Sequence, residues 1–180
     1  GIVALDALLN STSIEYGKVI FGYGNPRAIQ KKVRFTEANL NRMFKPSDLL
    51  SSSEQSSYEY GRAEFLKKYL DKADALLDIH SSATPNSQPF IICESNAEEI
   101  AKYLPTQLVV SGFDNLEPGG TDHYMNSNNK IGICIECGYS SDPSTAQKAK
   151  DTIIAFLIVR GHIAGNLHST PQTHIEMQDI

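Results

Sequence analysis

The sequence predicts an α/β fold whose central sheet is mixed or mostly parallel and is flanked by helices. Short apolar segments alternate along the chain with segments whose apolar residues recur at helical spacing. Two of the apolar segments, residues 73–79 and 131–137, are typical of strands buried inside such a sheet. At 180 residues, the chain is long enough to form one domain with a hydrophobic core.

The first part of the chain begins with a helical pattern over residues 1–9 (GIVALDALL). No capping residue precedes this pattern, so we expect the chain to be truncated at its N-terminus. Residues 18–23 (KVIFGY) predict a strand, and the Gly-Asn-Pro signal at residues 24–26 predicts a turn after it. We expect a polar loop from there to about Phe44.

A helix follows over residues 54–70, with Ser53 as its candidate cap. Its apolar positions roughly follow helical spacing, at Tyr58, Phe65, Leu66, Tyr69 and Leu70. Residues 73–79 (ADALLDI) then predict a buried strand. Two further strands are predicted at residues 89–93 and 107–110, with a helix over residues 97–104 between them.

The glycine pair at residues 119–120 opens a loop that we expect to run into one helical turn. Residues 131–137 predict the most strongly apolar strand of the chain. A long helix is predicted from Pro143 to about Ala164, because proline is favoured in the first turn of a helix.

One α/β domain is therefore expected over residues 1–168, incomplete at its N-terminus. Residues 169–180 are polar, contain Pro171 and have too few apolar residues to form a core of their own. They are expected to be a tail, or the start of a C-terminal domain that this chain lacks.

The charge balance argues against a nucleic-acid-binding protein, because the net charge is −5, the pI is about 5.5 and no basic stripe is present. The longest apolar run, residues 153–159, is far too short to cross a membrane. No secretory signal is visible. Three cysteines do not predict a disulfide framework, so we expect a reducing, cytoplasmic setting.

A histidine closes the strand predicted at residues 73–79. Strand alternation puts Asp78 and His80 on one face, where the carboxylate can hold one ring nitrogen of the histidine. His80 lies at the carboxyl end of the strand, where open α/β sheets bind ligands. From this segment alone, two interpretations are open: His80 is a metal ligand, or it hydrogen-bonds a loop.

A single carboxylate, Glu136, interrupts the apolar strand at residues 131–137. Such a carboxylate is costly unless it is paired, hydrogen-bonded or protonated, and burial raises its pKa into the range of a general base near neutral pH. The alternative is a buried salt bridge with an arginine. We favour a catalytic role, because Gly138 leaves room at the end of the strand. Cys134 and Cys137 are expected to face opposite sides and to be core residues.

Cationic and amide side chains gather in the loop before Phe44. Arginine is suited to bidentate carboxylate binding, so Arg42 beside Asn41 is a candidate carboxylate site. Arg34 is a candidate for stabilising a developing oxyanion. The alternative is that these arginines are only solvated. The loop at residues 117–124 has the glycines of a segment that lines a pocket.

These residues together resemble the aspartoacylase/succinylglutamate desuccinylase family of the zinc carboxypeptidase superfamily. The matching segments, in the order of the family, are Asn25-Pro26-Arg27-Ala28, Arg34 with residues 39–44, Asp78-Ile79-His80, and residues 132–138. The resemblance implies a three-layer zinc-carboxypeptidase-like fold with a central mixed, mostly parallel sheet. It also implies one zinc ion in each complete active site.

The resemblance implies a role for each candidate residue. His80 would be the third zinc ligand, supported by Asp78. Glu136 would activate the attacking water and pass its proton to the leaving amine. Arg34 would polarise the scissile carbonyl, and Asn41 and Arg42 would hold a substrate carboxylate.

Two departures from the family pattern matter. The family carries a His-x-x-Glu pair just before a helix like residues 1–9, and the present sequence starts too late to contain it. We therefore expect two zinc ligands upstream of Gly1, and we expect this chain alone to bind zinc poorly. An arginine that aspartoacylases carry before the catalytic-glutamate strand is also absent, with Asn126 near its place and Lys130 as the only cation there. N-acetylaspartate therefore fits this sequence less well than other acylated amino acids.

The leading hypothesis is a zinc-dependent deacylase that hydrolyses the amide bond of an N-acyl amino acid or a similar small carboxylate-bearing amide. A metallocarboxypeptidase acting on peptide C-termini is a second hypothesis, and a non-catalytic carboxylate-binding domain is a third. The expected partner is a small molecule, with no nucleic acid and no membrane, and a homo-oligomer is left open.

Overall fold

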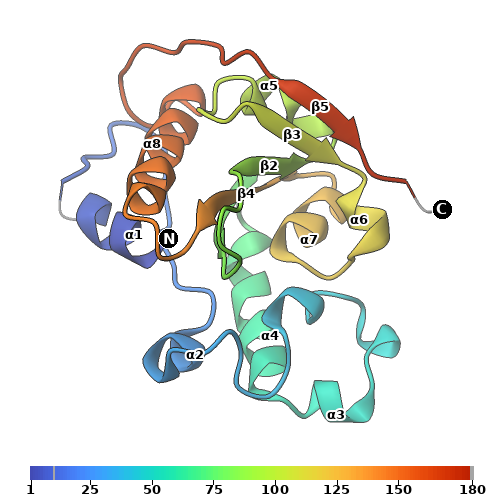
Figure 1. Cartoon of the computed structure of the whole chain (residues 1–180). Helices are drawn as coiled ribbons and strands as arrows, with labels where there is room; N and C mark the ends of the chain where they lie inside the picture. The colour runs from blue at the N-terminus through green and yellow to red at the C-terminus, as the bar shows by residue number, and fades with distance from the viewer. Residues whose placement is uncertain (10, 179–180) are drawn as a thin grey trace.

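A mixed five-stranded sheet runs through the middle of the molecule in the order β1-β4-β2-β3-β5 (Figure 1). The computed structural model describes residues 1–9 and 11–178. The strands are β1 (Ala75–Ser82), β2 (Phe90–Cys93), β3 (Leu108–Ser111), β4 (Ile131–Tyr139) and β5 (Thr173–Glu176). β4 runs parallel to β1 and antiparallel to β2, and the remaining pairs are parallel. The mixed sheet flanked by helices that the sequence predicts is confirmed.

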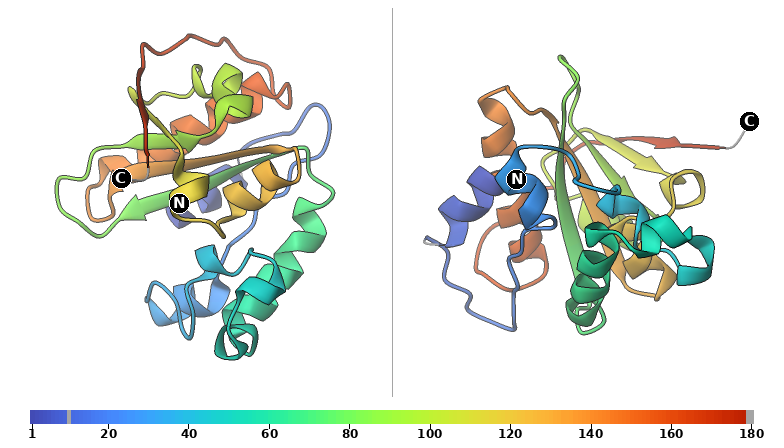
Figure 2. Two further views of the ribbon diagram at one scale, coloured as in Figure 1. Left: turned by 90° about the vertical axis from the view of Figure 1, so that its right-hand side faces the viewer. Right: turned by 90° about the horizontal axis from the view of Figure 1, so that it is seen from below.

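Helices cover both faces of the sheet and give three layers (Figure 2). The α-helices are α1 (Ile2–Leu9), α2 (Pro26–Lys31), α3 (Ser52–Gln55), α4 (Tyr58–Leu70), α5 (Glu98–Ala101), α6 (Phe113–Leu116), α7 (Thr121–Ser127) and α8 (Ser144–Val159). Short 3-10 turns lie at η1 (Leu40–Arg42), η2 (Ser47–Leu49) and η3 (Ser95–Ala97). None of the helices in the described part of the chain is long and apolar enough to cross a membrane.

Two hydrophobic clusters lie on opposite sides of the central strands. The larger joins α1, α5 and α8 to inward-facing residues of the sheet, including Ile133 and Ile135. The smaller joins α4, α7 and the segment around η1, including Met43 and Met125. Because side chains alternate along a strand, the residues between those of the larger cluster point to the second face, and Asp78, His80 and Glu136 are among them.

The strand predicted at residues 18–23 is absent from the structure, where this segment is extended chain without ladder pairing. Val19 and Phe21 pack on the larger cluster, whereas Ile20 is 66% exposed. The alternating pattern therefore comes from an extended segment lying over a core, which imitates the period of a strand. The expected polar loop after it also contains α2, which begins at Pro26 and is capped by the Asn25 side chain.

The helix predicted at residues 54–70 is two helices with their own caps. Ser51 begins α3 in a capping box with Glu54, and Ser57 begins α4. Ser53 is therefore not the cap, because it lies inside α3, and the chain turns after α3 before Ser57 caps α4. The helix predicted at residues 97–104 is shorter, ending at Ala101, and α8 ends at Val159 rather than near Ala164.

The polar C-terminal stretch contributes an edge strand. Residues 173–176 form β5, which lies parallel to β3 and is exposed along its length. Asn10, which follows the first helix, and residues 179–180 of the predicted tail lie outside the described residues.

A fully buried carboxylate on α4 fixes the loop that leads to η1. Glu59 accepts hydrogen bonds at Oε1 from the Asn25 amide (3.0 Å) and from the backbone and hydroxyl of Thr36 (2.6 and 2.7 Å). Its Oε2 accepts from the backbone N–H groups of Glu37 and Ala38, each at 3.2 Å. Burial alone would raise the pKa of Glu59, but these hydrogen bonds lower it to about 2.

We expect Glu59→Gln to destabilise the fold by about 1–3 kcal/mol, because the new amide places donors against buried backbone donors. The stabilisation from the ionised carboxylate is complete above about pH 4.5 and is lost as the pH falls toward 2. Urea denaturation at pH 5 and pH 3 should therefore show a smaller loss of stability on acidification in the variant than in the wild type.

Glu64→Gln is the matched control, since Glu64 lies on the same helix with its side chain 47% exposed and pairs with Lys67. Its change should stay within about 0.5 kcal/mol. Equal destabilisation by both variants would show that the hydrogen bonds of Glu59 do not hold the loop.

Candidate active site

The carboxyl ends of β1 and β4 bring a histidine and a glutamate side by side. His80 and Glu136 are partners in the parallel register of these two strands, and Asp78 lies two residues before His80 on the same face. The N-terminus of α7 and the η1 turn approach this face. Helix α7 packs directly against β4, where a Cβ at Gly132 would collide with the carbonyl oxygen of Asp122.

The ring of His80 is oriented by the carboxylate behind it. His80 Nε2 lies 3.1 Å from Asp78 Oδ2, and the same oxygen accepts a hydrogen bond from the Thr121 hydroxyl. Donation of the Nε2 proton to Asp78 leaves Nδ1 available as a metal ligand. This contact is the one that the metal-ligand interpretation of His80 requires, and a loop contact is also present, because the Asn41 amide lies near the same nitrogen.

The charge of Asp78 raises the pKa of His80 to about 9, although burial acts in the opposite direction. Burial alone would raise the pKa of Asp78, but His80 and Thr121 lower it to about 2. In the absence of a metal, the imidazole is therefore protonated at neutral pH, and a metal ion must displace a proton to bind it.

Glu136 presents an oxygen that makes no hydrogen bond. Its Oε2 is buried without a partner, and within the described residues no lysine or arginine forms a salt bridge with it. Burial raises the pKa of Glu136, while the charges of His80 and Arg34 lower it. A carboxylate with one unpaired buried oxygen beside a histidine suits proton transfer better than the alternative role in a buried ion pair.

The loop before Phe44 brings its amide to the histidine. Asn39 caps η1 by accepting from the Asn41 backbone, and Asn41 Nδ2 lies 3.2 Å from His80 Nε2. The Arg42 guanidinium donates to the Asn41 carbonyl at 2.7 Å and also pairs with Glu117. Arg34 is exposed, and its positive charge acts on both Glu136 and Arg42.

All six residues predicted from the sequence therefore lie in one region, and all but Arg34 adjoin another of the six, since Arg42 hydrogen-bonds the Asn41 carbonyl. Asp78, His80 and Asn41 are in contact, and Glu136 adjoins His80 through the strand pairing. Sequence reasoning did not single out Thr121 or Glu117, although both lie in the loop that it expected to line a pocket. Glu59 was also missed, and its signal was an acidic residue in register with Ala63, Leu66 and Leu70 on the buried side of α4.

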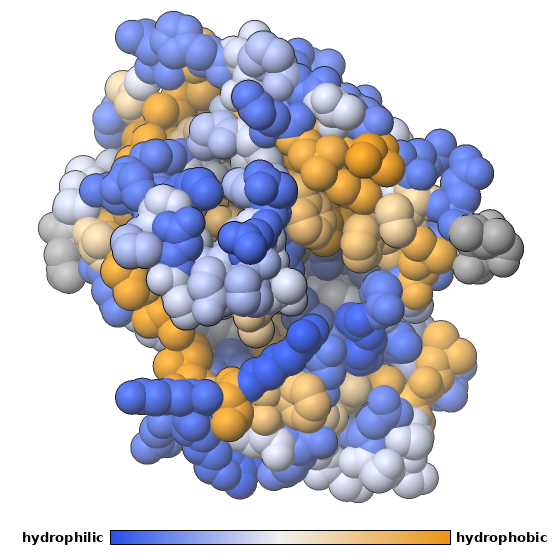
Figure 3. Space-filling model, in the orientation of Figure 1, coloured by the Kyte–Doolittle hydropathy of each residue, from blue (hydrophilic) through white to orange (hydrophobic). Residues whose placement is uncertain are grey.

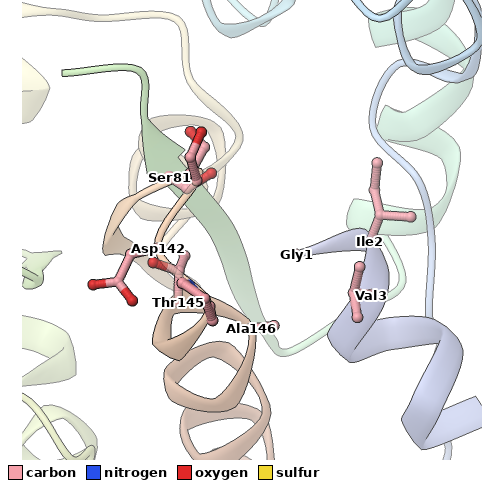
Figure 4. Close-up of a pocket in the computed structure, with 10 residues that line it drawn as sticks. Gly1, Ile2, Val3, Ser81, Asp142, Thr145 and Ala146 are labelled. Carbon is pink, nitrogen blue, oxygen red and sulfur yellow. The ribbon is translucent and has the colours of Figure 1, made fainter. Parts of the chain in front are cut away.

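Two hollows lie near this region. One, of about 340 Å³, lies between the start of α1 and the strand end, with Ser81, Asp142 and Thr145 facing Ile2 and Val3 (Figure 4). The other, of about 620 Å³, is lined by Phe44, Lys45, Pro46, Leu49, Lys67, Pro118, His123, Tyr124 and Ser127. The surface is visibly hollowed between the part that holds the sheet and the part that holds α2, α3 and α4 (Figure 3).

The described residues do not form a complete metal site by themselves. Across residues 1–9 and 11–178, no three histidine, cysteine, aspartate or glutamate side chains come together closely enough to hold a metal ion. His80, with its ring fixed by Asp78 and with Glu136 alongside, fits a single zinc ligand.

We expect Asp78→Asn to lower the pKa of His80 from about 9, because the largest charge that opposes the effect of burial is removed and only the smaller effects of Glu136 and Asp122 remain. Titration of the His80 ring signals by NMR in metal-free protein measures this shift. Asp114→Asn, a change of another carboxylate to an amide, is the control and should leave the His80 pKa near 9. A His80 pKa unchanged by Asp78→Asn would show that the carboxylate does not govern the ring.

Comparison with known proteins identifies the family of this chain. The model of the succinylglutamate desuccinylase/aspartoacylase catalytic domain matches residues 1–160. An N-acyl-aromatic-L-amino acid amidohydrolase (carboxylate-forming) from Xenopus tropicalis is 32% identical over 128 residues, which cover 63% of this chain and 41% of that protein. The chain thus spans less than half the length of this curated relative.

Solved structures show the same fold. The product-bound ectoine utilization protein EutE (DoeB) from Ruegeria pomeroyi matches with a TM-score of 0.78 at 23% identity, covering 98% of this chain and 58% of that one. A succinylglutamate desuccinylase/aspartoacylase from Rhodobacter sphaeroides matches with a TM-score of 0.67 at 17% identity. The match covers 87% of this chain and 50% of that one. The zinc-carboxypeptidase-like fold expected from the sequence is thereby confirmed.

Proposed function

The chain belongs to the succinylglutamate desuccinylase/aspartoacylase family, and we propose that the complete protein is a zinc-dependent deacylase of N-acyl amino acids or similar small carboxylate-bearing amides. The observation that carries this proposal is the adjacent pair at the ends of β1 and β4. One member is a histidine whose second nitrogen is held by Asp78, and the other is Glu136, whose buried oxygen has no partner. The match to amidohydrolases supports hydrolysis of an amide.

The remaining zinc ligands are proposed to come from residues upstream of Gly1. In support, a Cβ at Gly1 would lie 3.3 Å from the carbonyl oxygen of Ile79, the residue that precedes His80 in β1. A segment that enters at Gly1 therefore reaches the strand end where His80 lies. His80 would then be the third ligand of the site.

A bound zinc ion would supply a Lewis acid that polarises the scissile carbonyl and lowers the pKa of the attacking water. Glu136 takes a proton from that water and donates it to the nitrogen of the leaving amine as the amide bond breaks. Arg34 donates to the carbonyl oxygen as negative charge develops there. The products are a carboxylate from the acyl group and a free amino acid.

Asn41 and Arg42 are proposed to bind the carboxylate that remains on the amino-acid part of the substrate. A planar guanidinium that is fixed on one side by the Asn41 carbonyl presents its other donors in the geometry that a carboxylate accepts. This site favours a free acid over its amide. We also propose a cytoplasmic location, because Cys93, Cys134 and Cys137 are buried free thiols.

The proposal predicts about one zinc ion per full-length chain by elemental analysis, and much less in His80→Ala. The same zinc-loaded protein should hydrolyse at least one of three acids: N-acetyl-L-phenylalanine, N-acetyl-L-aspartate and N-succinyl-L-glutamate. His162→Ala is the matched control, since His162 lies after α8 and its ring contacts the Tyr16 carbonyl. Zinc content unchanged in His80→Ala would refute the ligand assignment, and cleavage of acyl dipeptides alone would favour a carboxypeptidase.

Glu136→Gln should reduce kcat by about 10²–10⁴-fold, because the amide cannot accept the proton of the attacking water. Zinc content should be close to that of the wild type, since Glu136 is not proposed as a ligand. Steady-state kinetics with elemental analysis of the same preparation separates the two effects. Near-normal kcat in this variant is the result that contradicts a role for Glu136 in proton transfer.

A further inference from the structure

We propose that Glu117 is a built-in competitor for the substrate carboxylate at Arg42. This inference rests on the proposed function, in which Arg42 binds the carboxylate of the substrate. It adds that the protein's own carboxylate occupies that arginine when substrate is absent. Glu117 would thereby set how strongly a substrate must bind to enter the site.

The contacts of the Arg42 guanidinium carry this inference. One terminal nitrogen donates to the Asn41 carbonyl at 2.7 Å, so the group is fixed in orientation. The other terminal nitrogen donates to the Glu117 carboxylate. A carboxylate therefore already lies where the proposed function puts the carboxylate of the substrate.

The segment that carries Glu117 is packed against the arginine's own backbone. The Gly119 carbonyl accepts a hydrogen bond from the Phe44 N–H at 3.2 Å. Gly119 has a φ of +105°, and a Cβ there would lie 2.8 Å from the Arg42 carbonyl oxygen. Because both backbones are in direct contact, the Glu117 side chain stays within reach of Arg42 and competes at a high effective concentration.

The pair is accessible enough to exchange. The side chains of Arg42 and Glu117 are 32% and 52% exposed, and ion pairs of this kind are weak. A substrate carboxylate can therefore displace Glu117, which turns outward into solvent. A neutral amide gains nothing from the displacement, so the competition affects acids alone.

Glu117 could instead hold the Arg42 guanidinium in position for the substrate, and its loss would then change the affinity for acids in the opposite direction. If Glu117 only positions the guanidinium, its loss weakens binding of acids. If Glu117 competes, its loss strengthens binding of acids. The direction of the change separates the two roles without any assumption about rates.

The test is equilibrium binding by calorimetry, with full-length zinc-loaded protein. The probes are N-acetyl-L-phenylalanine, N-acetyl-L-aspartate and N-succinyl-L-glutamate, each compared with its α-carboxamide. In Glu117→Gln, the Kd of the acids that bind should fall by about two- to fivefold, and the Kd of the amides should not change. A melting temperature equal to that of the wild type checks that the exposed substitution leaves the fold intact.

Glu99→Gln is the matched control, because Glu99 lies on α5 and also forms an exposed ion pair, with Lys102. This change removes the same charge and should leave every Kd unchanged. Arg42→Ala should abolish the preference for acids over amides. Unchanged or weaker acid binding in Glu117→Gln overturns the competitor role while Arg42 keeps its own. If Arg42→Ala keeps the preference for acids over amides, or if the wild type binds none of the acids, both the competitor role and the proposed carboxylate site are overturned.

Discussion

The buried carboxylate of Glu59 is the constraint on which the arrangement of the site depends. Residues 34–42 belong to an irregular segment, and a backbone without a ladder needs other partners for its N–H groups. Glu59 accepts from three consecutive backbone N–H groups of that segment and from the Thr36 hydroxyl. Its fifth donor, Asn25, also caps α2, so one side chain links α4, α2 and the loop. Asn41 reaches His80 because the chain just before it is fixed in this way.

A second chain of contacts joins the loop after α6 to the sheet. Thr121, the first residue of α7, donates to Asp78, and Asp78 in turn orients His80. Four residues earlier, Glu117 pairs with Arg42. The same short segment therefore contacts both Asp78, which orients His80, and Arg42. A polar face inside an otherwise apolar sheet is stable because most of its groups have partners, and among the described residues Glu136 Oε2 is a buried oxygen without one.

Much of the fold could be predicted from local sequence. The strands predicted near residues 73–79, 89–93, 107–110 and 131–137 are all present. Each is a short apolar run between turn signals, which is too short for a helix of ordinary length and is typical of a buried strand. The strand predicted at residues 18–23 was wrong, since Val19 and Phe21 pack on a core without pairing. The edge strand β5 was missed, because its exposed residues carry no apolar pattern and its position comes from pairing with β3. The antiparallel direction of β2 against β4 likewise has no local signal.

The sequence by itself determined which residues are candidates for the chemistry. An Asp-x-His at a strand end and one glutamate inside an apolar strand are local features, and strand alternation decides which face they share. Only the tertiary structure decided what surrounds them. Thr121 and Asp78 are 43 residues apart, and Arg42 and Glu117 are 75 apart. Contacts over such separations depend on how strands and helices pack, so no periodicity or spacing in the sequence indicates them.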